Sequence, residues 1–117
     1  MKSSLVVAVL LAVSLIGCKA NPVSGRKQLV LVSEEQAQAS SAQAYTQTMS
    51  EAQKKGKLSS DAALNARVKR ITDRLITQAG NMYAPSREWK WSVAVLDEPA
   101  LNAWCMPGGK MAIYTGI

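Results

Sequence analysis

The sequence contains no histidine and no phenylalanine, and it has only two cysteines among its 117 residues. Without histidine, this chain alone cannot build a Ser-His-Asp triad, a Cys-His dyad or a zinc site with histidine ligands. Two cysteines are also too few for a closed site of four thiolates. The usual hydrolytic chemistries are therefore excluded for this chain acting by itself, and its length is that of a single domain.

An apolar run lies close to the N-terminus. Residues 5–16 contain one polar residue, Ser14, and follow the charged Lys2. The run is shorter than the roughly 20 residues that a membrane-spanning helix needs. Its length and charged start are typical of a secretory signal. It ends in the string LIGC at residues 15–18, which resembles the lipobox of bacterial lipoproteins.

The lipobox resemblance implies a lipid anchor at Cys18. In that class the chain is cleaved before the cysteine, the thiol receives a diacylglyceryl group and the new amine is acylated. We therefore expect residues 1–17 to be a lipoprotein signal peptide. An ordinary cleaved signal with a coincidental cysteine is the alternative. An acylated Cys18 cannot pair with Cys105, so no intramolecular disulfide is expected.

The residue after the cysteine bears on localisation. An aspartate there would indicate inner-membrane retention in Gram-negative lipoproteins, so Lys19 favours the outer membrane of the bacterial cell envelope, facing the periplasm. Lys19, Arg26 and Lys27 suit anionic lipid headgroups near the anchor, and ordinary solvation is the alternative. The net charge of +6 is compatible with nucleic-acid binding, but the export signal argues against a nucleic-acid partner.

Residues 18–32 are expected to form a lipid-anchored tether, and residues 33–117 an α+β domain that begins with two helices. Ser33 and Gln36 have the spacing of a capping box. The first helix is predicted to continue to about Lys55 and to close at Gly56. Its apolar stripe is expected to contain Ala37, Ala44, Tyr45, Met49 and Ala52.

The second helix is predicted to start at residues 59–61 and to stop at Gly80-Asn81. Apolar residues recur at spacings of four, three and four, which places them on one helical face. These residues are Leu64, Val68, Ile71 and Leu75. The basic residues of this segment fall mostly elsewhere, and a solvated surface is their ordinary interpretation.

After residue 85 the apolar period changes from that of a helix to two. Residues 89–96 are predicted to be a strand with one heavy apolar face, formed by Trp89, Trp91, Val93 and Val95. Residues 103–106 and 111–115 are predicted to be two short strands. The glycines of residues 107–110 supply the positive φ that a hairpin turn requires. The predicted fold class is therefore α+β.

Few residues suggest chemistry by themselves. A nucleophilic cysteine needs a neighbouring base, and Cys105 has none in sequence, so we interpret it as a small, partly buried apolar residue. Asp97 and Glu98 would point to opposite faces of a strand, which favours a solvated turn over an acid/base pair. Trp89 and Trp91 are interpreted as core residues.

Two longer strings resemble a known family. Residues 21–29 read NPVSGRKQL, and residues 102–116 read NAWCMPGGKMAIYTG. Both are similar to exported zinc metalloendopeptidases of the HtpX/CAAX-prenyl-protease kind, which include LoiP-like and BepA-like envelope members and mitochondrial Oma-type members. The second string has that family's Asn-Ala-aromatic, Pro-Gly-Gly and final Thr-Gly pattern. The order of helices, strand and hairpin between the strings agrees as well.

This resemblance implies a gluzincin-like metallopeptidase domain that is incomplete in this chain. In the family, a following helix carries H-E-x-x-H, whose two histidines bind zinc and whose glutamate activates water. We expect that motif roughly 15–20 residues beyond Ile117, judging by helix and loop lengths. Zinc is therefore implied for the whole enzyme, while no catalytic or metal residue is assigned in this chain, which is expected to be inactive alone.

The resemblance also implies a role on the substrate side. The strand of Met111, Ala112, Ile113, Tyr114 and Thr115 resembles the family strand beside the cleft, and its edge could pair with an extended polypeptide. Ordinary sheet pairing is the alternative. The expected function is proteolysis of misfolded or envelope proteins. The alternative is a small non-catalytic lipoprotein that binds or scaffolds an envelope partner.

Overall fold

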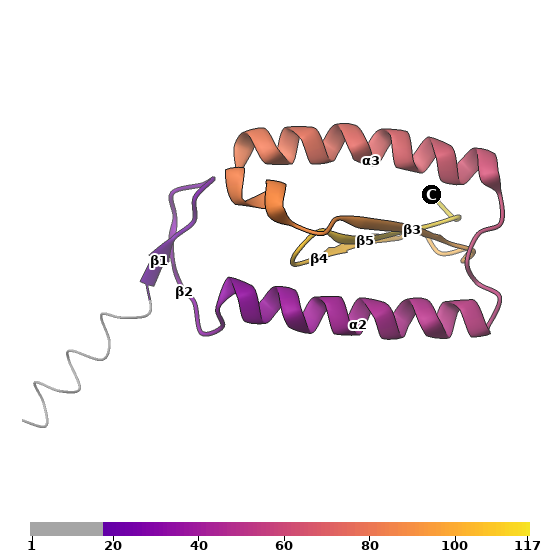
Figure 1. Cartoon of the computed structure of the whole chain (residues 1–117), viewed down its shortest axis with the longest axis horizontal. Helices are drawn as coiled ribbons and strands as arrows, with labels where there is room; N and C mark the ends of the chain where they lie inside the picture. The colour runs from indigo at the N-terminus through magenta and orange to yellow at the C-terminus, as the bar shows by residue number, and fades with distance from the viewer. Residues whose placement is uncertain (1–17) are drawn as a thin grey trace, which may run out of the picture. The chain divides into compact units, whose positions relative to one another are not determined.

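The computed structural model describes residues 18–117, so the predicted signal peptide at residues 1–17 lies outside the described residues. The chain divides into two compact units, with the boundary between Ser33 and Glu34. Figure 1 labels the helices and strands of both units. None of the helices within residues 18–117 has the length and hydrophobicity that crossing a bilayer would require.

The first unit contains a small antiparallel hairpin. Strand β1, Cys18–Ala20, pairs with β2, Lys27–Leu29. The Asn21 side chain holds the connection, because its Oδ1 accepts hydrogen bonds from the backbone N–H groups of Val23 at 2.9 Å and Ser24 at 2.8 Å. This is an Asx-type turn, the local structure that asparagine favours. The segment expected to form a tether therefore contains two short strands.

The second unit begins with α2, Glu34–Lys54, which confirms the first predicted helix. Its end is a Schellman motif: Lys57 N–H donates to Ala52 O at 2.8 Å and Gly56 N–H to Gln53 O at 3.1 Å. Gly56 has φ 65°, the conformation that favours glycine after a helix. The predicted closing role of Gly56 is confirmed.

The predicted apolar stripe of α2 is partly wrong. Ala52 is buried, and Tyr45, Met49 and Ala37 are half-buried, but Ala44 is exposed. The helix turns its Tyr45, Met49 and Ala52 side toward the sheet. Ala44 lies one position before Tyr45, about 100° around the helix, and so misses that face.

Helix α3, Ala62–Met82, confirms the second predicted helix, and the Asp61 carboxylate caps it by accepting a hydrogen bond from Leu64 N–H at 3.0 Å. The predicted buried face is rotated. Val68 is buried, but Ile71 and Leu75 are exposed, and Thr72 has only 2% of its surface exposed. The Thr72 hydroxyl donates within its own helix to Val68 O at 3.0 Å, which removes the cost of burying it.

The predicted helix stop at Gly80 is also wrong. Gly80 is buried inside α3, and a Cβ there would lie 3.0 Å from the Cγ of Arg87. The helix continues to Met82 and is followed by the 3-10 helix η1, Ala84–Glu88, whose first turn contains Pro85. Gly80 therefore permits close packing of η1 on α3 rather than ending the helix.

The two tryptophans lie before the strand in which they were predicted. Strand β3 is Ser92–Leu96, and Trp89 and Trp91 lie in the connection between η1 and β3, with ring centroids 5.3 Å apart. The Trp91 indole N–H donates to Ser86 O at 2.9 Å. Its ring occupies the space beside Gly109, since a Cβ there would lie 2.3 Å from Trp91 Cε3.

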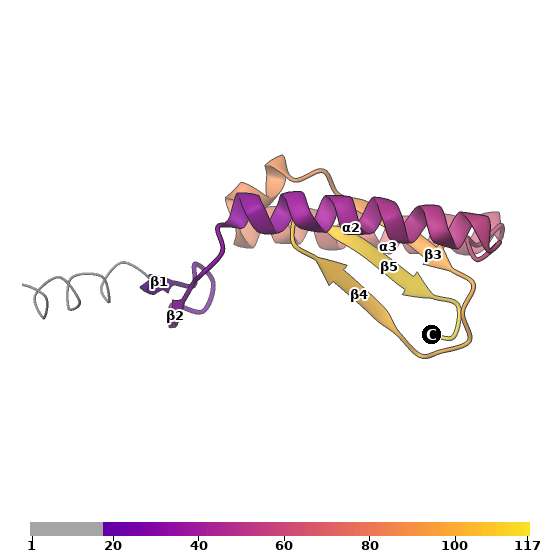
Figure 2. The same ribbon diagram turned by 90° about the horizontal axis from the view of Figure 1, so that it is seen from below.

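The sheet of the second unit has the order β3-β5-β4, where β4 is Ala103–Met106 and β5 is Lys110–Tyr114. Strand β5 is parallel to β3 and antiparallel to β4, which confirms the predicted hairpin. Figures 1 and 2 show the sheet between the two helices, with α3 on one face and α2 on the other. The fold of this unit is α+β, as predicted.

Because a helix covers each face of the sheet, β3 is buried on both of its faces and not on one as predicted. The strand predicted to have a single apolar face buries two successive residues, Val95 and Leu96, whose side chains point to opposite faces. Leu96 packs in the core with Ala52 of α2 and Ala112 of β5. Val95 lines the opposite side together with Val68 of α3.

Candidate functional site

The strand predicted to present an open edge lies in the middle of the sheet. Lys110–Tyr114 pairs with β3 on one side and with β4 on the other, and Thr115 N–H continues the first pairing by donating to Leu96 O at 2.9 Å. The prediction of a substrate-binding edge at residues 111–115 is therefore wrong. The hairpin returns β5 into the space between β3 and β4, which leaves those two strands with the outer edges (Figure 2).

The outer edge of β4 is free within residues 18–117, where no other strand pairs with it. Tyr114 N–H donates to Asn102 O at 3.0 Å. This bond identifies Asn102 and Tyr114 as a hydrogen-bonded pair. In an antiparallel ladder every second residue of a strand bonds to the neighbouring strand, and the residues between them point their N–H and C=O groups away from it. Trp104 then bonds to β5, while the backbone N–H and C=O groups of Ala103 and Cys105 point outward. Both of these residues are exposed.

The inner side of β4 is anchored on α2. Trp104 lies edge-on to Tyr45, with ring centroids 6.1 Å apart and an interplanar angle of 79°, a favourable aromatic arrangement. The Tyr45 hydroxyl donates to Met111 O at 3.2 Å, and burial raises the pKa of this phenol. These contacts attach the β4–β5 hairpin to α2 and so keep the outward-facing backbone of β4 in place.

The turn between β4 and β5 has the chemistry predicted for it. Gly108 and Gly109 have φ values of 84° and 78°, and Gly109 N–H donates to Met106 O at 3.2 Å. The Lys110 ammonium donates to Lys90 O and ties the turn to the segment before β3. The turn is therefore fixed from both sides.

Cys105 does not have the surroundings of a nucleophile. The residue is exposed rather than partly buried as predicted. Partial desolvation raises the pKa of its thiol, which disfavours the reactive thiolate. The thiol donates weakly to Met106 O at 3.6 Å. Its contribution to the site is its outward-facing backbone.

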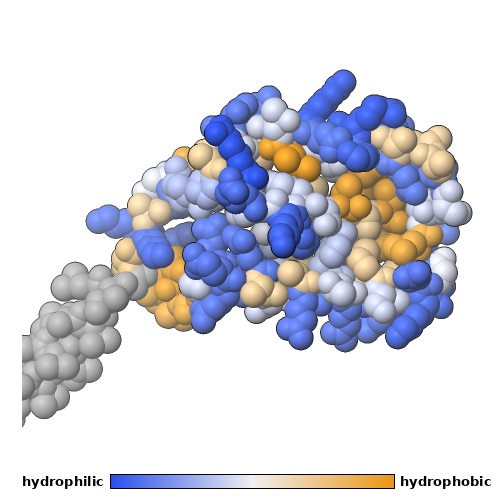
Figure 3. All heavy atoms as spheres, in the orientation of Figure 1, coloured by the Kyte–Doolittle hydropathy of each residue, from blue (hydrophilic) through white to orange (hydrophobic). Residues whose placement is uncertain are grey.

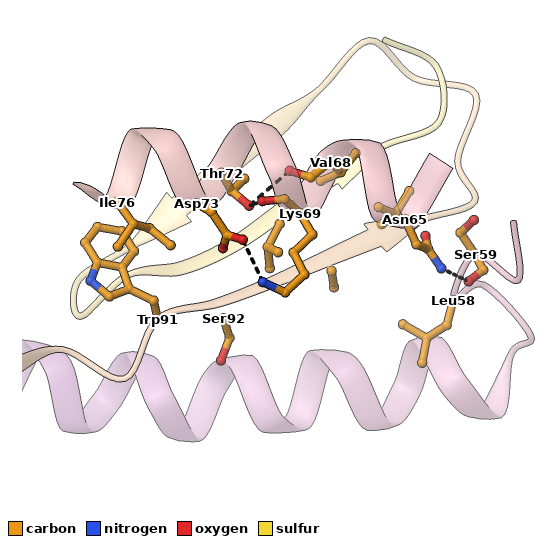
Figure 4. A pocket seen from close by; sticks show the side chains of 13 residues that line it. Leu58, Ser59, Asn65, Val68, Lys69, Thr72, Asp73, Ile76, Trp91 and Ser92 are labelled. Carbon is orange, nitrogen blue, oxygen red and sulfur yellow. Dashed lines mark hydrogen bonds and ion pairs between the residues drawn. The ribbon is translucent and has the colours of Figure 1, made fainter. Parts of the chain in front are cut away.

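The outer edge of β3 is partly closed by the chain itself. Ser59 N–H donates to Val95 O at 2.9 Å and Asp97 N–H to Lys57 O at 2.6 Å, which makes residues 57–59 a short antiparallel neighbour. Beside the rest of this edge lies a groove of about 520 Å³ between β3 and α3. Figure 4 shows its side chains, from Leu58 at one end to Trp91 at the other.

The groove beside β3 contains charges that neutralise each other. Lys69 Nζ lies 2.7 Å from Asp73 Oδ2 across one turn of α3, with both side chains more than half exposed. Such an exposed pair contributes little stability. Asn65 donates to Ser59 O at 2.9 Å, and its Oδ1 is buried without a partner. The groove thus offers polar and apolar contacts but no acid/base pair.

A second, smaller groove of about 220 Å³ lies between α3 and β5. Leu64 and Ile71 line it from the helix, and Ile113 and Ile117 from the sheet side. Figure 3 shows hydrophobic side chains gathered over the sheet between the two helices. Of the apolar residues predicted to be buried on α3, Leu64 and Ile71 border this groove, Val68 is buried, and Leu75 is exposed.

The adjacent carboxylates after β3 form an anchored turn. The Thr115 hydroxyl shares its one hydrogen between Asp97 Oδ1 and Glu98 O, each at 3.1 Å, and accepts from Glu98 N–H at 3.1 Å. A Cβ on Gly116 would lie 2.3 Å from Pro99 O. The Thr-Gly pair therefore locks this loop. The sequence did not predict that role, because the β4–β5 hairpin separates the loop from Thr115 and Gly116 along the chain.

The residues present do not fit a zinc site. The sequence has no histidine, and within residues 18–117 no three histidine, cysteine, aspartate or glutamate side chains lie close enough to hold a metal ion. Zinc in structural or catalytic sites takes at least three such ligands. Cys18 is exposed in β1, and its lipid attachment stays a prediction.

The chain is similar to parts of known metalloendopeptidases. It is 31% identical over 97 residues to the human mitochondrial metalloendopeptidase OMA1, a match that covers 83% of this chain and 18% of that protein. It is 48% identical over 27 residues to the mitochondrial metalloendopeptidase OMA1 of Arabidopsis thaliana, covering 23% of this chain and 6% of that protein.

The chain thus spans less than a fifth of the length of these curated relatives. No family model matches it, and no solved structure does. The two matches support a relationship to metallopeptidases.

Proposed function

We propose that this chain is the substrate-aligning part of a zinc metalloendopeptidase of the HtpX/CAAX-prenyl-protease kind. In this proposal the outer edge of β4 receives an extended polypeptide as an added antiparallel strand. The observation that carries the proposal is the outward-facing backbone of Ala103 and Cys105. The similarity to metalloendopeptidases over 83% of the chain supports it.

Strand addition would give affinity without much dependence on sequence, because main-chain hydrogen bonds supply it. Each outward residue offers one N–H donor and one C=O acceptor to the incoming strand. The contact of Trp104 with Tyr45 keeps β4 in place. The small Ala103 side chain leaves room for larger side chains of the polypeptide.

We further propose that the protein works in the bacterial cell envelope, attached through a lipid on Cys18 to the outer membrane and facing the periplasm. The lipobox-like string at residues 15–18 and Lys19 after it support this setting. Its substrates would be misfolded periplasmic or membrane proteins. Incorporation of labelled palmitate tests the anchor: the wild-type chain takes up label, and Cys18→Ser does not.

The second candidate is a non-catalytic lipoprotein that binds an envelope partner. Strand addition at the free β4 edge needs no catalytic group, so the same edge would serve this function. The two candidates differ in hydrolysis. Cleavage of casein by the polypeptide that contains this chain, abolished by a zinc chelator, supports the protease. Binding without cleavage supports the scaffold.

Hydrogen exchange tests the β4 edge directly. The amides of Ala103 and Cys105 should exchange rapidly in the free chain and become protected when an unfolded polypeptide such as reduced, carboxymethylated lactalbumin is added. The amide of Trp104 is a matched internal control, because it already bonds within the sheet. Polypeptide binding that leaves the Ala103 and Cys105 amides unprotected would contradict the proposed site.

A further inference from the structure

The hairpin of the first unit is rich in positive charge. Residues 18–33 contain Lys19, Arg26 and Lys27 and no aspartate or glutamate. No ion pair involves these cations within the part of the chain that the structure describes. The segment therefore has a local charge of one sign, which complements an anionic surface.

The same segment exposes large apolar side chains. Leu29 has 65% of its surface exposed and Leu31 86%, and Val23 and Val32 are more than half exposed. Figure 3 shows hydrophobic side chains beside hydrophilic ones over β1 and β2. Exposed apolar residues interspersed with cations and free of acids are typical of a segment that lies in a membrane interface.

The strand register sorts these side chains onto two faces. Leu29 pairs with Cys18, and Gln28 pairs with Lys19. Directly opposed residues of an antiparallel pair point to the same face, and successive residues to opposite faces. Leu29 and Cys18 therefore share one face, while Gln28 and Lys19 lie on the other.

We propose that this hairpin binds an anionic lipid bilayer, with the face of Leu29 inserted at the headgroup level and the opposite face in water. Lys27 lies on the inserted face with an aliphatic stem long enough to bring its ammonium to the phosphates. Arg26 and Lys19 add attraction to an anionic surface. Binding of this kind requires neither lipid on Cys18 nor proteolysis at β4, so it is independent of the function proposed above.

Site-specific labelling of the full chain tests the orientation. In a background of Cys18→Ser and Cys105→Ser, a single thiol is introduced by Leu29→Cys or by the matched control Gln28→Cys and is labelled with an environment-sensitive fluorophore. Vesicles containing phosphatidylglycerol should shift the emission of the label at position 29 to the blue. A quencher carried by the lipid should quench it at least threefold more strongly than the label at position 28.

Charge dependence provides the second measurement. The blue shift at position 29 should weaken in vesicles of phosphatidylcholine alone, and in 0.5 M salt, where charges are screened. Arg26→Gln with Lys27→Gln should weaken apparent vesicle affinity at the label by about 25-fold, at about fivefold for each cation.

Two outcomes would overturn the proposal. Equal responses of the labels at positions 28 and 29 would exclude a hairpin inserted by one face. A blue-shifted label at position 29 in the absence of vesicles would mean that the protein itself, or a second copy of it, covers Leu29.

Discussion

Substitution of Gly109 by alanine tests the packing that fixes the β4–β5 turn. Gly109 has φ 78°, a conformation that costs an L-residue about 1–2 kcal/mol. An added Cβ would also lie 2.3 Å from Cε3 and 2.5 Å from Cδ2 of Trp91. That ring cannot easily withdraw, because its indole N–H donates to Ser86 O. Forced overpacking typically costs about 1–3 kcal/mol.

We therefore expect Gly109→Ala to lower the free energy of unfolding by about 2–5 kcal/mol, the sum of the conformational and steric costs. Gly56→Ala is the matched control, because Gly56 has φ 65° and no atom within 4 Å of an added Cβ. It should lose only the conformational part, about 1–2 kcal/mol.

Urea unfolding followed by circular dichroism measures both variants, with an osmolyte added if the wild-type chain is too unstable for a baseline. The double variant Gly109→Ala with Trp91→Leu should recover part of the loss, because the smaller side chain relieves the clash. Equal losses in Gly109→Ala and Gly56→Ala would refute the placement of the Trp91 ring against the turn.

Three further outcomes are expected. Thr115→Val should lower the free energy of unfolding by about 1 kcal/mol, because it removes the hydroxyl's hydrogen bonds to the half-exposed Glu98 backbone and to the exposed Asp97 carboxylate; Thr77→Val, whose hydroxyl bonds only within α3, should change it much less, and equal urea midpoints would contradict the loop-locking role. The pKa of Tyr45 is raised above its ordinary value of 10.0, so its stabilising effect is complete below pH 10 and is lost as the pH rises through the higher folded-state pKa; Tyr45→Phe should therefore show a shallower fall in stability at alkaline pH, and an unchanged pH profile would speak against it. The exposed Ile71 and Leu75 predict that the chain alone is marginally stable or aggregation-prone, and that replacing both by glutamine raises its solubility; a sharp thermal transition in a monodisperse wild-type sample would show this reasoning to be wrong.

Local chemistry accounts for the parts of the fold that the sequence predicted well. Asp61 marks the start of α3 through a side-chain hydrogen bond, and Gly56 marks the end of α2 through its positive φ. Both signals involve only a few neighbouring residues. The glycines of the β4–β5 turn act in the same way. Such signals are independent of distant parts of the chain, so both helices and the hairpin were predictable.

Long-range packing accounts for the parts that were missed. The buried face of α3 includes Thr72 because its hydroxyl is satisfied inside the helix, which a count of apolar residues does not register. The central place of β5 depends on its pairing with β3, from which β4 separates it in the sequence. The sequence therefore placed the free edge at residues 111–115, whereas the structure places it at Ala103 and Cys105. The residue pattern of β5 does not distinguish an inner strand from an outer one.

The interposed position of β5 has a consequence for the order of folding. Pairing of β4 with β5 closes only a short turn. Pairing of β3 with β5 brings together residues such as Val93 and Met111, which are much further apart in the sequence. Loop-closure entropy makes such parallel pairing intrinsically slow. We expect the hairpin and α2 to form the folding nucleus, with β3 and α3 docking afterwards. Conservative substitutions at Val93 should then accelerate unfolding and leave the refolding rate nearly unchanged, whereas slower refolding would place β3 in the nucleus.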